Sequence, residues 1–191
     1  TAKPGDVRFV DYNKDGSISD ADKTKIGKGM PDWTYGLTLD TEWKNFDLNV
    51  FFQGTVGNDL FDFSQRGDIP AMNRPSWILN RWHGEGTSNH LPRMTNANPN
   101  SNWRSSDLYI KDGSYLRLKS AQFGYTLPQK WSRTLSIDKF RVFVMAENLL
   151  TFTQYDGFDP EVASGGYTTI GIDRGVYPQA RTISVGANII F

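Results

Sequence analysis

The protein has 191 residues, which is enough for one domain with a hydrophobic core of its own. Its 21 basic side chains balance its 21 acidic ones, so no broad basic face is available to a phosphate backbone, and we expect no nucleic-acid partner. The chain contains no Cys, which excludes disulfides, thiolate metal sites and cysteine nucleophiles.

Residues 1–32 are predicted to form a loop with an EF-hand-like calcium site. The twelve residues 11–22 place oxygen-bearing side chains at the first, third and fifth positions. Gly16 takes the sixth position, where the loop must turn sharply, and we expect Ile18 to anchor the loop by packing. The predicted ligands are Asp11, Asn13, Asp15, Ser17 (through its backbone carbonyl) and Asp22.

The pattern departs from a true EF-hand in two ways. Asp22 stands where the longer Glu usually reaches the ion with both oxygens, so we expect a weaker site. Residues 5–10 read as extended chain instead of the preceding helix, which favours a structural clip over a sensor. The alternative is an acidic surface turn without an ion, because Asp, Asn and Gly favour turns for reasons of their own.

Five segments are predicted to be strands. Segments 33–44 and 46–56 alternate apolar and polar residues with a period of two, as in a strand with one apolar face. The turn between them is short enough for a hairpin. In segment 115–127 the apolar phase shifts, which predicts a bulge near Ser120. Segments 140–150 and 181–191 alternate again.

The connections between these strands alternate between short and long. Short links at 44–45 and 128–139 are separated by the polar stretches 57–114 and 151–180. This is the pattern of an outer-membrane β-barrel, with short periplasmic turns and long outer loops. If the carboxyl end is periplasmic, both long loops and residues 1–32 lie outside the cell. The aromatic side chains near strand ends, such as Trp33 and Phe191, suit the girdles at the membrane interfaces.

The predicted fold is therefore all-β, and five strands would be only part of it. Single-chain bacterial barrels have at least about eight strands, and an open edge in lipid leaves backbone groups unpaired. The amino end lacks signal-peptide character, so we expect a mature form or a fragment. The alternative is a secreted, calcium-stabilised β-sandwich that binds carbohydrate, in which the same apolar faces are buried against each other.

Other candidate site residues lie in the two long loops. Trp77, Trp82 and Trp103 could stack on cargo or pack the loop on itself. His83 and His90 have no carboxylates at ligand spacing, and Asp156, Asp159 and Glu161 resemble the carboxylate pairs of glycosidases only in composition. No nucleophile or acid pair stands out, so we expect no enzyme. Four charged residues would face a wet barrel lumen: Arg117, Lys119, Arg141 and Glu147.

The order and spacing of many short motifs resemble the C-terminal part of the SusC/RagA-type TonB-dependent transporters of Bacteroidetes. These motifs include PDWTYG (31–36), KDGSYLRLK (111–119) and GFDPE (157–161). Further motifs lie at 4–6, 11–22, 26–27, 46–48, 51–54, 57–59, 124–128, 147–149 and 178–191.

The resemblance implies a plugged transmembrane barrel of about 22 strands, to which this chain would contribute the last five. It also implies a SusD-like surface lipoprotein as partner, energy supplied through TonB, and cargo that is an oligosaccharide or a peptide. The plug and the TonB-contacting segment are absent from this sequence. An aromatic last residue such as Phe191 fits the signal that the outer-membrane assembly machinery of such bacteria recognises.

Overall fold

The computed structural model describes residues 2–64, 73–74, 76–95, 100–134, 136–161 and 169–191. Parts of the predicted long loops 57–114 and 151–180 therefore lie outside the described residues.

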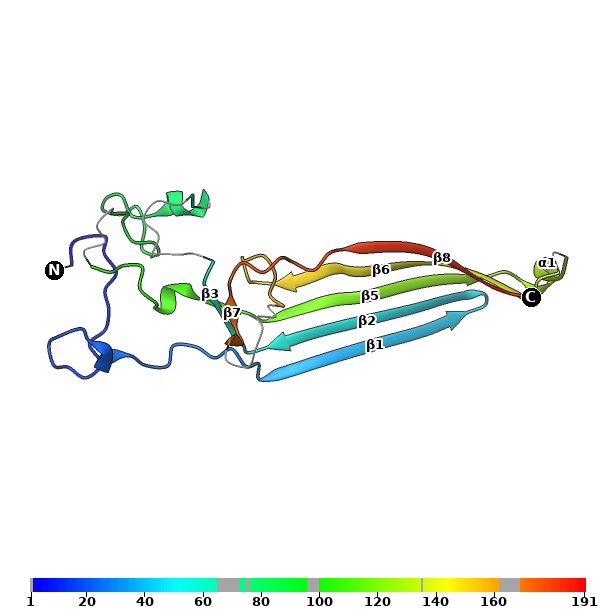
Figure 1. Ribbon diagram of the computed structural model, residues 1–191, viewed down its shortest axis with the longest axis horizontal. Helices are drawn as coiled ribbons and strands as arrows, with labels where there is room; N and C mark the ends of the chain where they lie inside the picture. Colours follow the sequence, from blue (N-terminus) through cyan, green and yellow to red (C-terminus); the bar gives the residue numbers. More distant parts are fainter. Residues whose placement is uncertain (1, 65–72, 75, 96–99, 135, 162–168) are drawn as a thin grey trace.

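Five long strands form one antiparallel sheet in the order β1-β2-β5-β6-β8 (Figure 1). Their ends lie within three residues of the predicted segments. In chain order the strands are β1 (Trp33–Trp43), β2 (Phe46–Val56), β5 (Tyr115–Thr126), β6 (Lys139–Thr153) and β8 (Thr182–Ile190).

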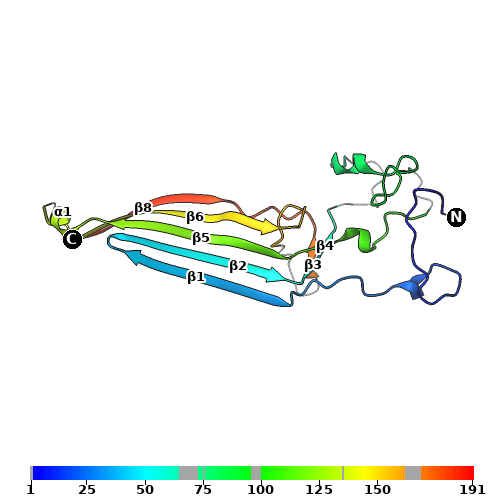
Figure 2. The same cartoon turned by 180° about the vertical axis from the view of Figure 1, so that it is seen from behind.

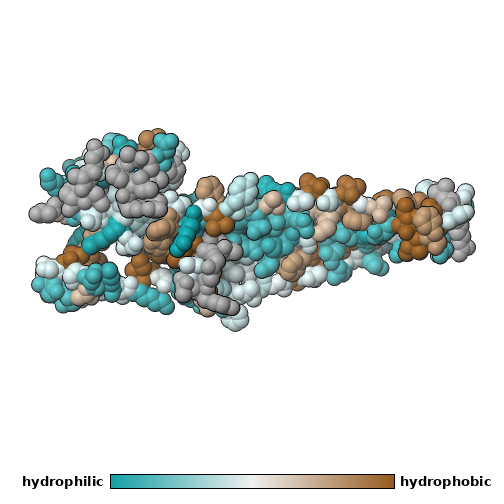
Figure 3. All heavy atoms as spheres, viewed as in Figure 1, coloured by the Kyte–Doolittle hydropathy of each residue, from teal (hydrophilic) through white to brown (hydrophobic). Residues whose placement is uncertain are grey.

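The register brings the apolar residues of all five strands to one face of the sheet. Leu39 pairs with Val50, which pairs with Ala121, and the same row continues through Ala146 and Ile183. Paired residues point to the same face, so the period-two pattern of each strand adds up to a continuous apolar surface. The opposite face carries mostly polar residues, and hydrophilic atoms cover the middle of the strands in Figure 3.

The apolar face is exposed, which overturns the β-sandwich alternative. Ile183 and Val185 are 70% and 79% exposed, and Leu37 is 62% exposed. A sandwich would bury these side chains against a second sheet about 10 Å away. In the described parts of the chain the one other sheet lies beyond the ends of the long strands and covers neither face (Figure 1).

The predicted bulge is present. The pairing of β5 with both neighbours shifts between Leu118 and Ser120, so Lys119 is the irregular residue. On β6 the shift coincides with Asn148, whose φ is +52°. Because the shift skips one residue of β5, Leu118 and Ala121 lie on the same apolar face despite their odd spacing.

The two ends of the sheet differ. The 44–45 turn, helix α1 (Gln129–Thr134) and the carboxyl end lie at one end, while the described parts of the amino-terminal segment and of both long loops lie at the other (Figures 1 and 2). Helix α1 (Gln129–Thr134) lies in the link at the short-turn end, where the sequence predicted no helix.

The long loops contain short elements that the sequence did not predict. Strands β3 (Asp59–Asp62), β4 (Ile110–Asp112) and β7 (Ile172–Asp173) form a second sheet in the order β4-β3-β7. A small core of Ile78, Trp103 and Tyr109 packs beside it. Among the described residues, the 3-10 helices η2 (Ser76–Asn80) and η3 (Asp107–Tyr109) lie in the first long loop, and η1 (Asp20–Asp22) lies in the amino-terminal segment.

Candidate functional site at the loop end of the sheet

A buried ion network joins the second long loop to the polar face of the sheet. Arg117 of β5 is 3% exposed, and its guanidinium donates to Asp159 Oδ1 (Nη2–Oδ1 2.5 Å) and Glu161 Oε2 (Nη1–Oε2 2.8 Å). Lys119, two residues along the strand, donates to both oxygens of Glu161. Both cations therefore bind the same carboxylate, and the GFDPE motif anchors the loop.

Asp159 is held in its charged form inside this network. Burial opposes ionisation, but hydrogen bonds from Arg117 and from the backbone N–H groups of Gln179 and Glu161 outweigh it and lower the pKa of Asp159. A buried carboxylate that accepts three bonds from three segments fixes where the loop begins and ends. The glycosidase-like reading of Asp159 and Glu161 finds no support in this geometry, because both are occupied by structural cations.

A second buried pair ties the amino-terminal segment to the first long loop. The side chain of Asp6 is fully buried and accepts two bonds from Arg93 (Nε–Oδ1 2.7 Å, Nη2–Oδ2 3.1 Å). Asn102, also fully buried, donates to Asp6 and accepts from the backbone N–H of Val7. The bond from Arg93 outweighs the burial of Asp6, and further bonds from Asn102 and the Lys3 N–H help to lower the pKa of Asp6. The sequence offered no signal for this pair, because its members lie 87 residues apart.

A third polar cluster joins the strands of the small sheet to the second long loop. Tyr155 donates to Asp173 (Oη–Oδ2 2.5 Å), and burial followed by this bond raises the pKa of Tyr155 well above its usual range. Lys111 lies between Asp62 (3.1 Å) and Asp156 (2.5 Å). The two long loops are thus cross-linked to each other as well as to the strands.

The predicted calcium loop closes on itself through its own side chains. Asp11 accepts from the backbone N–H groups of Lys14 and Gly16, and Asp15 accepts from that of Ser17. Asp22 reaches back across the loop and accepts from the N–H groups of Tyr12, Asn13 and Ser19. The Ser19 hydroxyl accepts from the Ala21 N–H, which completes a capping box at the start of η1.

The loop offers oxygen donors that suit calcium, but its carboxylates are few. Bonds from the N–H groups of Ser19, Asn13 and Tyr12 outweigh burial and lower the pKa of Asp22. No group of three or more His, Cys, Asp or Glu side chains in the described residues is arranged to hold a metal, so an ion here would also need amide and carbonyl oxygens.

Ile18 does not anchor this loop. We expected its side chain to pack, but it is 44% exposed. The capping box and the Asp22 bonds close the loop without it, which is why the chain can leave Ile18 in solvent.

The three Trp side chains have different surroundings. Trp103 is buried in the small core and Trp77 packs against the same core, so both hold the loop together. The ring of Trp82 lies against Gly5, where an added Cβ would come within 2.3 Å of it. Trp82 also lines a cavity of about 570 Å³ together with Arg8, His90 and Asp107. Of the three, Trp82 is the one that lines this cavity.

The two His residues do not form a site. His83 is exposed, and its ring nitrogen contacts the backbone carbonyl of Arg81. His90 is exposed at the rim of the cavity. Neither contributes to a group that could hold a metal within the part of the chain that the structure describes.

The chain is similar to known receptors over almost its whole length. It is 37% identical to a TonB-dependent receptor of Formosa agariphila over 98% of this chain and 19% of that receptor. It is 29% identical to the TonB-dependent receptor SusC of Bacteroides thetaiotaomicron, over 99% of this chain and 18% of SusC. Sequence and fold are those of a SusC/RagA-type TonB-dependent receptor. The chain spans about a fifth of the length of these curated relatives.

Solved structures agree with the sequence comparison. The RagAB peptide importer in its open-open state matches with a TM-score of 0.70 and 26% identity, over 92% of this chain and 19% of that chain. Its closed-closed state matches with a TM-score of 0.72 and 26% identity, over 95% and 20% of the two chains. No protein-family model matches the chain.

The five-stranded sheet therefore corresponds to part of a TonB-dependent receptor barrel, which confirms the predicted all-β fold. Receptors of this type are outer-membrane β-barrel transporters. None of the helices in the described residues is long and apolar enough to cross a membrane.

Proposed function

We propose that this chain supplies five strands and the outer loops of a TonB-dependent importer of large nutrients in the bacterial outer membrane. The uncovered apolar face carries this proposal. Nine-residue and longer strands with exposed apolar side chains on one face and polar side chains on the other suit hydrocarbon on one side and a wet lumen on the other.

Strands absent from this chain would complete the barrel. In the described residues β1 and β8 each pair on one side only, and an unpaired edge is costly in lipid. The polar face would then meet a plug. The short-turn end with Phe191 would face the periplasm and the long loops the outside, since short inner turns and long outer loops are the rule in such barrels.

The loop end would receive cargo together with a SusD-like surface lipoprotein, and TonB would supply the energy through another part of the receptor. The cross-linked loops support this role, because ion pairs such as Arg117–Asp159 and Asp6–Arg93 hold the loops at this end of the sheet in one conformation. The cargo would be an oligosaccharide or a peptide. Trp82 would contact either the cargo or the SusD-like lipoprotein. No catalytic role is proposed.

Membrane fractionation and uptake by cells test this function. The full-length receptor that contains this chain should be recovered from the outer membrane only with detergent. Deleting its gene should abolish growth on either peptides or oligosaccharides as the nutrient, and deleting TonB should reproduce the loss. Recovery in the soluble fraction, or unchanged growth on both nutrient classes, would refute the proposal.

We further propose that the 11–22 loop binds calcium. Asp11, Asn13, Asp15 and Asp22 would provide side-chain oxygens, and Ser17 would provide its carbonyl. The oxygen-bearing side chains of Asp11, Asn13 and Asp15 at alternate positions of one turning loop support a cation among them. When bound, the ion would cross-link the loop and hold residues 5–32 in place; it would not take part in any reaction.

Limited proteolysis of the purified receptor tests the calcium site. Removing calcium with a chelator should speed cleavage within residues 5–32, and Asp15→Ala should do the same in the presence of calcium. Asp20→Ala is the matched control, because Asp20 is 93% exposed and outside the predicted ligand set. A cleavage rate that responds neither to chelator nor to Asp15→Ala would contradict calcium binding by this loop.

A further inference from the structure

The turn between β1 and β2 contains a lysine in an unfavourable backbone conformation. Lys44 has a φ of +55°, in the left-handed region that Gly and Asn adopt far more readily than a residue with a long side chain. Such outliers gather where a side chain has a function that outweighs the strain. Gly or Asn would form this turn at lower cost, so the conformation directs attention to what the Lys44 ammonium does.

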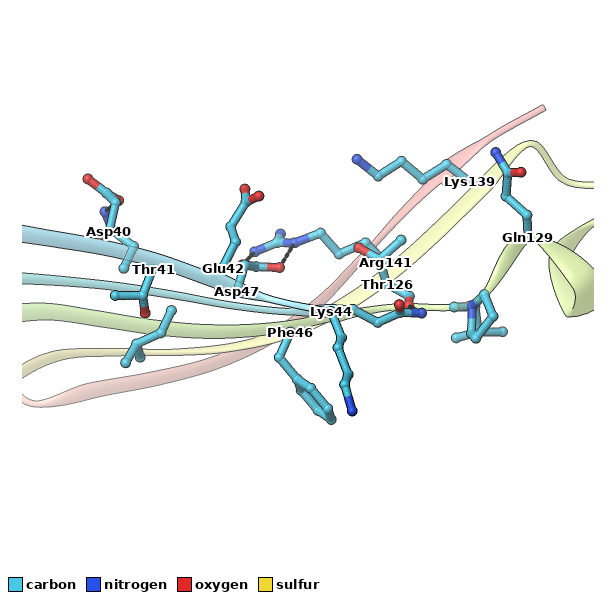
Figure 4. A pocket seen from close by; sticks show the side chains of 15 residues that line it. Asp40, Thr41, Glu42, Lys44, Phe46, Asp47, Thr126, Gln129, Lys139 and Arg141 are labelled. Atoms are coloured by element: carbon cyan, nitrogen blue, oxygen red, sulfur yellow. Dashed lines mark hydrogen bonds and ion pairs between the residues drawn. The ribbon is translucent and has the colours of Figure 1, made fainter.

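The Lys44 side chain extends over the apolar side of the sheet. Its Nζ lies 4.5 Å from the ring centroid of Trp43, and Trp43 pairs with Phe46 on the apolar face. Figure 4 shows Lys44 and Phe46 pointing to one side of the sheet, while Glu42, Asp47 and Arg141 point to the other. Trp43 is itself 66% exposed, so the ring and the ammonium share one open surface.

The cations on the two sides of this end differ in their partners. On the polar side, Arg141 binds Asp47 with two bonds (Nε–Oδ1 2.9 Å, Nη2–Oδ2 2.5 Å). On the apolar side, Lys44 forms no ion pair with a carboxylate among the residues that the structure describes. An ammonium at the edge of an apolar surface, in contact with an aromatic ring and without a carboxylate partner among the described residues, is complementary to an anion located outside the chain.

We propose that Lys44 and Trp43 form a binding site for the phosphate of a glycerophospholipid in the membrane leaflet that surrounds the short-turn end. The inference rests on the proposed function, because it requires the apolar face to meet lipid. The exposed side chains of Leu37, Leu39 and Trp43 form an apolar row that would contact the acyl chains up to this end of the sheet. At the turn the surface changes from apolar to cationic, which is where phosphate groups of the leaflet lie.

The backbone strain provides a sharp variant. Lys44→Asn removes the charge and places in the turn a residue that tolerates positive φ, so the fold should be at least as stable as before. Lys44→Arg keeps the charge. Lys25→Asn is the matched control, because Lys25 is exposed in the amino-terminal loop at the opposite end of the molecule.

The test is native mass spectrometry of the full-length receptor titrated with phosphatidylglycerol in detergent, with the melting temperature measured in parallel. We expect Lys44→Asn to weaken binding of the first lipid severalfold without lowering the melting temperature, and Lys44→Arg and Lys25→Asn to bind like the wild type. Equal binding by Lys44→Asn and wild type would overturn the proposal. Equal occupancy by inorganic phosphate alone would also overturn it. The receptor could fail to import cargo while this result held, so the two proposals can fail separately.

Discussion

Arg117 and Asp159 lie 42 residues apart in the sequence and form an ion pair in which both side chains are less than a tenth exposed. Arg117 belongs to a long strand and Asp159 to the loop that follows the next one. The pair therefore fixes the position of the loop relative to the sheet, at the end of the molecule where we expect cargo to bind.

Removing one partner of this pair should destabilise the loop strongly. Arg117→Met leaves Asp159 buried without its counter-ion, and such losses cost about 3–5 kcal/mol, whereas replacing both partners is far less harmful. We expect Arg117→Met and Asp159→Leu each to expose residues 154–161 to hydrogen exchange, and the double variant to restore much of the protection. Additive losses in the double variant would show that the pair is not coupled.

Acid should release the amino-terminal segment. The pKa of Asp6 is lower in the folded protein than in the unfolded chain, so its contribution to stability is complete above the unfolded value of about 4. The contribution is lost as the pH falls through the depressed folded value. Proteolysis of residues 2–9 by an acid-active protease should therefore accelerate well below pH 4. Arg93→Met should already show rapid cleavage at neutral pH; a wild-type segment equally sensitive at both pH values would contradict this.

Neighbouring residues of β6 should differ sharply in their tolerance of charge. Val144 lies on the apolar face with Phe123 and Val185, and Met145 lies on the polar face with Gln122 and Ser184. An Arg on the lipid side near the middle of a barrel costs about 2–4 kcal/mol. We expect Val144→Arg to lower the urea midpoint of the detergent-folded receptor substantially and Met145→Arg to have a much smaller effect. Similar effects of both would mean that lipid does not cover the apolar face.

Two glycines with the same backbone conformation separate strain from packing. Gly5 and Gly16 both have a φ of +85°, so Ala adds a similar backbone cost of about 1 kcal/mol at either position. At Gly5 the new Cβ would also clash with Trp82, whereas nothing lies within 4 Å of it at Gly16. Gly5→Ala should displace Trp82 and shift its fluorescence, measured with calcium absent, while Gly16→Ala should leave it unchanged. Unaltered fluorescence in Gly5→Ala would contradict the contact between Gly5 and the ring of Trp82.

The sequence alone determined the five strands, the pairing of the first two as a hairpin and the alternation of short and long connections. Each of these follows from local patterns: a pleated strand presents successive side chains to opposite faces, so residues 33–56 and 181–191 record in their spacing which face is apolar. The shift at Lys119 was visible for the same reason. The order and spacing of many short motifs also indicated the SusC/RagA-type family.

Only the tertiary structure decided how the loops are held. Asp6 with Arg93 and Arg117 with Asp159 are pairs between distant segments, and a charged residue in a polar loop carries no local sign of its partner. The strands β3, β4 and β7 are two to four residues long, too short for any periodicity to appear. Helix α1 and the strained Lys44 likewise follow from chain geometry at the turns, where steric fit between elements, not residue spacing, sets the backbone.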